Sequence, residues 1–319
     1  MTPVRNEAWV LNAFLKATSL WADYIIIADQ MSTDGSREIA LSYEKVILIN
    51  NDNPEFNEAE RQKMLIDKAR EIEGDKILFG LDADEIFAAN FKDTDDWQAI
   101  LNSKPGDVFW FKWAEICPNQ KEYYDSTYYP WMFHDDGLEP HGNYVRNMHS
   151  MRIPYPIEEK QMYYVDDFRV LHMSRLNKLR CNSKARFYTF VDWENNKRSV
   201  VRLSRMYRGD SSVNKKRFQL YSFMVYKKTE YAFDLFDEVD TTSSKFYFDE
   251  YIVDRLSRYN TKKFSQLDIW DYELFRDYNL TDHRSFSVKV FHFYLRCTKN
   301  IAGSIIIRVV DKVLRFIFK

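Results

Sequence analysis

Two aspartates, Asp82 and Asp84, directly follow the apolar run 77–81 in the sequence Leu-Asp-Ala-Asp-Glu. A strand over 75–81 would deliver both acids to its carboxyl end, and residues two apart on a strand point to the same side. Hard divalent cations prefer oxygen ligands and often bridge protein carboxylates to substrate phosphates. The pattern predicts a Mn²⁺ or Mg²⁺ site that also holds a phosphorylated ligand. The alternative is an acidic surface turn, because Asp-x-Asp is a common sequence.

The elements that must position these acids alternate along the first hundred residues. The apolar patterns predict strands at 24–28, 45–50 and 75–81, with helices at 36–43 and 57–73. This order is typical of an α/β fold with a parallel sheet and crossover helices. Ligands of such sheets bind outside the carboxyl ends of the strands. Asp29, Asn50 and Asp52 are therefore expected near Asp82 and Asp84.

The pattern changes after residue 105. Strands are expected at 107–113 and 163–173, the second ending near His172, and the chain then becomes mostly helical. This change predicts an α/β domain over 1–200 and a helical C-terminal region over 201–319.

Three motifs occur in a fixed order: Arg5-Asn6-Glu7, then Asp29-Gln-Met-Ser-Thr-Asp-Gly-Ser36, then Leu81-Asp-Ala-Asp-Glu85. Together they resemble family 2 glycosyltransferases, in particular the bacterial branch whose acid motif reads Asp-x-Asp-Glu. The resemblance spans residues 3–90. It implies a GT-A fold, which is a Rossmann-like, mostly parallel sheet flanked by helices, here with a helical C-terminal extension. It also implies a nucleotide-sugar donor, a divalent metal and inversion at the anomeric carbon.

The resemblance assigns roles to single residues. It implies donor binding by Val4, Asn6, Glu7, Asp29, Arg61, Asp82 and Ala83, and metal binding by Asp82, Asp84 and His172. Asp29 would contact the nucleobase and Arg61 the diphosphate. Arg61 could equally be an ordinary charge on a helix surface, and a lone His172 could be a packed or hydrogen-bonded side chain.

Inverting transfer needs a base that deprotonates the acceptor hydroxyl. The candidates are Glu115, Glu158, Glu159, Asp166 and Asp167. Glu158 fits the chain order best, although each of them could be an exposed acid without a catalytic role.

One feature departs from the family pattern. The family's first strand precedes the Pro-x-x-Asn-Glu segment, and Met1 and Thr2 leave no room for it. We therefore expect either a start further upstream or a sheet without that strand, whose donor pocket would be weakened.

Composition limits the partners and the compartment. The formal net charge of −2 gives no field that would attract nucleic acid. Three cysteines without CxxC spacing favour a reducing compartment, the cytoplasm. The segment 301–319 is apolar and basic, which is typical of a helix at a membrane interface, or of a terminal helix docked on the domain.

These observations predict transfer of a sugar from a nucleotide donor to a glycan or lipid-linked acceptor in cell-surface polysaccharide or lipopolysaccharide synthesis, at the cytoplasmic face of the membrane. Three alternatives remain. A phosphatase of the haloacid dehalogenase type would need Thr or Val at Ile86, and a nucleotidyltransferase would need glycines within 4–7. A degenerate, non-catalytic transferase that acts as a scaffold would have no need for Asp29, Asp82 and Asp84.

Overall fold

A computed structural model describes residues 1–138, 150–154, 161–208, 216–259 and 261–318. The chain forms two compact units, Met1–Leu176 with Lys216–Thr242, and Asn177–Lys215 with Ser243–Lys319. The units are interleaved along the chain, whereas the sequence pattern suggested a single division near residue 200. Segment 216–242 belongs to the first unit because its strand β10 (Arg217–Gln219) pairs with β7 (Glu122–His134).

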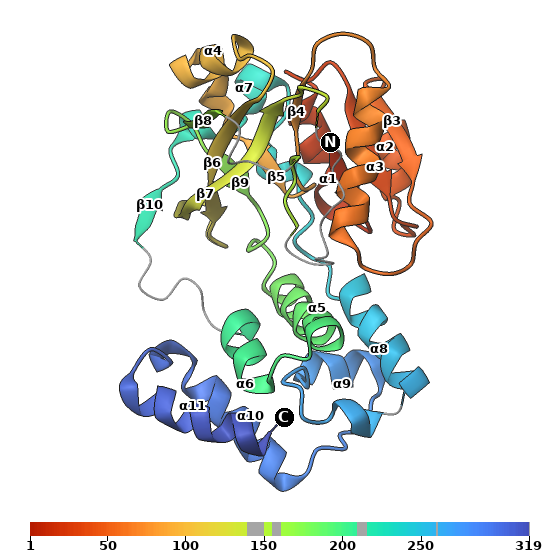
Figure 1. Ribbon diagram of the computed structural model, residues 1–319, viewed down its shortest axis with the longest axis vertical. Coiled ribbons are helices and arrows are strands. Elements are labelled where there is room, and N and C mark those ends of the chain that lie inside the picture. Colours follow the sequence, from red (N-terminus) through yellow and green to blue (C-terminus); the bar gives the residue numbers. More distant parts are fainter. Residues whose placement is uncertain (139–149, 155–160, 209–215, 260, 319) are drawn as a thin grey trace. The chain divides into compact units, whose positions relative to one another are not determined.

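The first unit begins with a small parallel sheet in the order β1-β2-β3. Figure 1 labels its strand β3 near the helices α2 and α3. Its elements are β1 (Thr2–Val4), α1 (Ala8–Thr18), β2 (Ile25–Asp29), α2 (Ser36–Leu41), β3 (Val46–Asn50) and α3 (Glu58–Arg70). The strands and helices predicted for this region are confirmed within a few residues at each end. A short strand is present where the sequence pattern left room for none, while a start further upstream stays a prediction. Three fully buried residues, Thr2–Val4, are enough to form it beside β2.

Helices cover both faces of this sheet. Side chains alternate between the faces along a strand, and Ile25 and Ile27 of β2 join the core cluster that contains the buried side of α1. Ile26 and Ala28 instead join the cluster that contains the buried side of α3. The apolar run of β2 is continuous for this reason, as expected for a strand buried on both faces.

The larger sheet has seven strands within the described residues, and it is of mixed direction. Besides β7 and β10, it contains β4 (Ile77–Phe79), β5 (Glu85–Phe87), β6 (Asp107–Ile116), β8 (Gln161–Tyr164) and β9 (Val170–His172). Strands β8 and β9 run parallel to β6, while β4 and β6 pair antiparallel with β7. A fully parallel arrangement is therefore confined to the small sheet. The single strand expected at 163–173 is two separate strands, which pair with different parts of β6.

Two hydrogen bonds join the two sheets. The Met1 ammonium donates to the Phe79 carbonyl at 2.8 Å, and the Leu81 amide donates to the Met1 carbonyl at 3.2 Å. This is the hydrogen-bond pattern of two parallel strands. It places the start of β1 beside the end of β4, directly before Asp82.

The second unit is helical. Its helices are α5 (Lys178–Asn196), α6 (Val200–Leu203), α8 (Tyr247–Tyr259), α9 (Tyr272–Tyr278), α10 (Phe286–Cys297) and α11 (Ile305–Ile317). Its interior contains the buried guanidinium of Arg186, which pairs with Asp249 at 2.6 Å and Asp271 at 2.8 Å. Among the residues that the structure describes, no helix has the length and apolar character needed to cross a membrane. A short helix, α4 (Asp95–Leu101), and a helical turn, α7 (Lys228–Tyr231), complete the first unit.

Candidate functional site

The two aspartates of the acid motif lie in a tight turn between β4 and β5. Strand β4 ends at Phe79, so the alternation of a strand does not continue to Asp82 and Asp84. The side chain of Asp82 is 37% exposed, whereas that of Asp84 is 4% exposed. The Glu85 amide donates to the Asp82 carbonyl at 3.0 Å and closes the turn. The two acids therefore have different surroundings, one open to solvent and one buried.

His172 lies beside the buried acid. Its Nε2 is 3.7 Å from Asp84 Oδ1, and its ring stacks on Trp113 with 4.6 Å between centroids. Strand pairing brings His172 close to Asp84. Strand β9 lies next to β5 with His172 opposite Glu85, and the Met173 amide donates to the Asp84 carbonyl at 2.9 Å. Ligand atoms of Asp84, Glu85 and His172 lie within 4.8 Å of one another, a spacing that could hold a metal ion.

Glu85 is completely buried, and its carboxylate already accepts several hydrogen bonds. The donors are the Asp82 amide and Trp113 Nε1, both at 2.9 Å, and the guanidinium of Arg152. Burial raises the pKa of Glu85 to about 7, the charges of Asp82 and Asp84 add to the increase, and Arg152 opposes it. Glu85 therefore holds the turn in place through these hydrogen bonds, beside Asp84 and His172 in the group that could hold a metal ion.

Arg152 is the residue at this site that sequence reasoning missed. Its Nη2 donates to Asp82 Oδ2 at 2.7 Å, and its Nη1 to the Gly80 carbonyl at 3.2 Å. The charges of Asp82 and Glu85 keep its pKa above the usual range despite burial. It also lies over the Trp131 ring, 5.5 Å from the centroid. Arg152 belongs to no sequence motif, so its sequence neighbours do not indicate that it lies at this site.

Gly80 is the sequence feature that indicates the close contact between the backbone after β4 and Arg152. A Cβ at Gly80 would lie 2.9 Å from Arg152 Cβ and 3.1 Å from its carbonyl oxygen, closer than side chains tolerate. A glycine inside an apolar strand pattern often marks a close backbone approach. That rule could have indicated a neighbour here, although not which residue.

Hydrogen bonds connect the first motif, Arg5–Glu7, to the second, Asp29–Ser36. Asn6 Oδ1 accepts from the Thr33 amide at 2.7 Å, and Ser32 Oγ accepts from the Asn6 amide at 2.9 Å. The Glu7 amide donates to Ser36 Oγ at 2.8 Å. Asn6 adopts a φ of 55°, a left-handed conformation that asparagine tolerates better than most residues. The side chains of Asn6 and Ser36 thus fix the loops that follow β1 and β2.

Asp29 ends β2 and pairs in register with Val4 of β1. Both are buried. Asp29 Oδ2 lies 3.3 Å from an Arg37 nitrogen, while Oδ1 is buried and has no hydrogen-bond partner among the described residues. A buried carboxylate oxygen in this state can accept from an N–H group of a ligand.

The position of Arg61 does not support its predicted contact with the diphosphate. Its guanidinium lies 4.9 Å from the centroid of Phe56, and within the described part of the chain no hydrogen bond or ion pair links its side chain to the acid motif. Helix α3 nevertheless begins near the site, because Glu58 in its first turn contributes to the electrostatic surroundings of Arg152.

The predicted base, Glu158, lies outside the described residues, as does Glu159. Of the other candidates, Glu115 is nearest to the site, because it pairs in register with His172. Its carboxylate accepts from Arg175 Nε at 2.8 Å. Asp166 accepts from Tyr128 and Lys112, and these hydrogen bonds lower its pKa, which makes it a weaker base.

Asp167 is engaged elsewhere in the first unit. Its carboxylate accepts from the Asp96 amide at 3.2 Å, and its own amide donates to the Asp96 carboxylate at 2.8 Å. These contacts tie Asp167 to the start of α4.

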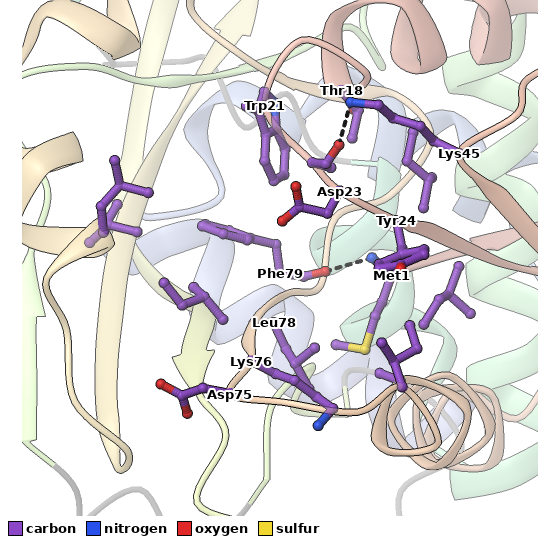
Figure 2. A pocket seen from close by; sticks show the side chains of 18 of the residues that line it. Met1, Thr18, Trp21, Asp23, Tyr24, Lys45, Asp75, Lys76, Leu78 and Phe79 are labelled. Carbon is purple, nitrogen blue, oxygen red and sulfur yellow. Dashed lines mark hydrogen bonds between the residues drawn. The ribbon is translucent and has the colours of Figure 1, made fainter.

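A separate cavity of about 720 Å³ lies at the opposite ends of the strands (Figure 2). Trp21, Lys45, Asp75 and Phe79 line it, together with the residues that begin β2 and β4. None of the residues predicted to bind donor or metal is among its lining residues. The cavity is therefore distinct from the site at the carboxyl ends.

No protein-family model matches the chain, and no curated protein matches it. The structure has a partial spatial likeness to the crystal structure of residues 1–349 of TarS from S. aureus. The TM-score is 0.34 and the identity 11%, over 67% of this chain and 72% of that one. A likeness at this level does not establish a GT-A fold or a reaction. The chain is of the mixed α/β class.

Proposed function

We propose that this chain is a metal-dependent glycosyltransferase that uses a nucleotide-sugar donor. The observation that carries the proposal is the juxtaposition of Asp84 and His172, which come from different strands and lie 3.7 Å apart. The more exposed Asp82 lies in the same turn. The order of the three sequence motifs adds independent support.

The donor set fits a divalent cation. Carboxylate oxygen and neutral imidazole together suit Mn²⁺, and Mg²⁺ is the alternative for an oxygen-rich site. The Arg152 guanidinium pairs with Asp82 and Glu85, whereas Asp84 lies beside His172, so a cation at Asp84 would meet a carboxylate that Arg152 does not contact. A metal bound there would neutralise the charge that develops on the leaving diphosphate.

Residues of the chain would bind and orient the donor. Asp29, with its buried acceptor oxygen, would accept a hydrogen bond from the nucleobase, and Val4, Asn6 and Glu7 would form the adjoining wall. Arg152 would hold Asp82 in a fixed orientation toward the donor.

Inversion at the anomeric carbon and the use of Glu158 as base remain part of the proposal. The acceptor is proposed to be a glycan or a lipid-linked sugar of cell-surface polysaccharide synthesis.

Binding and hydrolysis of a panel of nucleotide sugars, measured with Mn²⁺ and with chelator, test this proposal. We expect at least one donor to bind in a Mn²⁺-dependent way, and Asp84→Ala and His172→Ala to lose that dependence. Asp254→Asn, which removes an exposed carboxylate on α8, is the matched control and should bind as the parent does. The proposal fails if no donor binds, or if Asp84→Ala binds and turns over donor normally.

One observation favours a second candidate function, that of a degenerate glycosyltransferase without catalytic activity that acts as a scaffold. The Arg152 guanidinium contacts Asp82 at 2.7 Å, which is the kind of position that a cation would take. If this ion pair replaces the metal, Mn²⁺ should not change donor binding, and no variant of Asp84 should alter it.

A further inference from the structure

Helices α10 and α11 expose an unusual number of large apolar side chains. Nine of them are at least half accessible to solvent: Phe286, Val290, Phe293, Ile305, Ile306, Val309, Val313, Phe316 and Ile317. Exposed apolar side chains are normal when scattered, but a contiguous group is typical of an interaction surface. On each helix they are related by spacings of three, four and seven positions, so each helix presents one apolar face.

The opposite faces of the two helices are anchored inside the second unit. On α10, Phe291 and Leu295 are buried, and on α11, Ile307 and Asp311 are buried. The exposed faces are therefore not the sides by which the helices pack on the unit.

The two helices are also fastened to each other. Tyr294 donates to Asp311 at 2.9 Å, and Arg205 pairs with the same carboxylate while it donates to the Leu295 carbonyl at 2.8 Å. The rings of Phe291 and Phe318 stack at 3.9 Å between centroids. Figure 1 shows α10 and α11 side by side. The exposed apolar side chains of these two helices are together called the α10–α11 face.

The exposed charges of α11 and of the turn before it have one sign, whereas on α10 Lys289 is paired with Asp282 at 3.2 Å. From residue 283 to 319 the sequence contains a single acid, Asp311, which is buried and paired with Arg205. Lys299, Arg308, Lys312 and Arg315 are exposed, and none of them forms an ion pair within the described residues. On the helix α11 the three basic residues lie along one border of the apolar face, as in helices that lie in a membrane interface.

We propose that the α10–α11 face docks on the surface of an anionic lipid bilayer. The apolar side chains would enter the boundary between headgroups and acyl chains, and the basic border would contact the anionic headgroups. A second copy of the chain fits less well, because a symmetric dimer through this face would bring two basic borders together. The inference rests on the second unit alone and does not depend on the proposed transferase activity.

Cosedimentation of the full chain with vesicles tests the proposal. We expect binding to vesicles of phosphatidylcholine with added phosphatidylglycerol, weaker binding to phosphatidylcholine alone, and release at high salt. Reversal of three charges in Arg308→Glu/Lys312→Glu/Arg315→Glu should lower the partition coefficient at least about tenfold, since each basic residue near an anionic surface contributes measurably. Phe316→Asp should also weaken binding.

The matched control reverses three exposed lysines of the first unit, in Lys104→Glu/Lys121→Glu/Lys228→Glu, and should bind as the parent does. Far-ultraviolet circular dichroism verifies that every variant is folded. Absence of vesicle binding by the folded parent overturns the proposal, and so does an equal loss in the control. Concentration-dependent dimerisation without lipid, abolished by Phe316→Asp, would instead assign the face to a second copy.

Discussion

Arg152 Nη2 lies 2.7 Å from Asp82 Oδ2, and the same guanidinium contacts the fully buried carboxylate of Glu85. One cation thus bridges the first and last acids of a four-residue motif from a position 67 residues beyond Glu85. The arrangement separates the motif into parts with different tasks. Glu85 and Arg152 fix the turn, while Asp82 and Asp84 present carboxylates at the site.

Removal of the guanidinium in Arg152→Met should destabilise the protein by about 3–5 kcal/mol, because it leaves Glu85 as a buried acid without its counter-charge. Urea denaturation measures the loss. The double variant Arg152→Met/Glu85→Gln should recover part of it, since the neutral amide needs no cation. Lys68→Met, which breaks an exposed ion pair with Glu71, is the control and should change stability by less than about 1 kcal/mol. Equal losses in the single and double variants would contradict this account.

Gly80→Ala should cost about 1–3 kcal/mol, because the new methyl group would lie 2.9 Å from Arg152 Cβ and force the backbone apart. Gly303→Ala provides the control, since nothing lies within 4 Å of a Cβ there. Thermal unfolding of both variants compares the sites. If Gly80→Ala proves as harmless as Gly303→Ala, Arg152 does not pack against β4 in this way.

The local elements of the first hundred residues could be predicted from the sequence, because their patterns are strong. The run Ile25–Asp29 and the amphipathic helix at 58–70 are examples. Proximity of His172 to Asp84 was also expected, on the resemblance to a family. Strand β1 was not expected, because three residues carry too little periodicity to be recognised.

Long-range pairing could not be predicted. Nothing local indicates that β4 joins β7 in an antiparallel pair, or that β8 and β9 both run beside β6. For the same reason Arg152 was missed, since its partners lie about 70 residues away and it belongs to no motif. Predicted donor contacts such as Asn6 bind loop backbone in the structure, a role that residue type alone does not distinguish from ligand binding.

Ser36→Ala tests the interlocked loops. Ser36 is fully buried, and its Oγ accepts from the Glu7 amide while it donates to Asp34 at 2.6 Å. Removal of the hydroxyl leaves a partly buried N–H without its acceptor, so we expect a loss of about 1–3 kcal/mol in urea denaturation. Ser42→Ala, at an exposed position near the end of α2, is the matched control and should cost less than about 1 kcal/mol. Comparable losses at the two serines would show that Oγ of Ser36 does not hold the loop.

His292 gives the stability a defined dependence on pH. Its Nε2 lies 2.7 Å from the Gln266 carbonyl and its Nδ1 lies 3.2 Å from Arg284, an arrangement that suits the neutral ring. Burial lowers the pKa of His292, with Arg284 and Arg296 acting in the same direction and Asp268 and the Gln266 carbonyl opposing.

The unfolded chain binds a proton at His292 near pH 6.5, whereas the folded chain binds it only at lower pH. The contribution of His292 to stability is therefore fully present above about pH 6.5 and is lost as the pH falls from there through the lower pKa of the folded state, with a slope of at most about 1.4 kcal/mol per pH unit. In urea denaturation between pH 5 and pH 8, His292→Gln should have a shallower acid slope than the parent, because glutamine does not titrate. His283→Gln, at an exposed position nearby in the sequence, should retain the slope of the parent. An unchanged slope in His292→Gln would mean that His292 is not buried in its neutral form, and that the helix α10 is not packed as described.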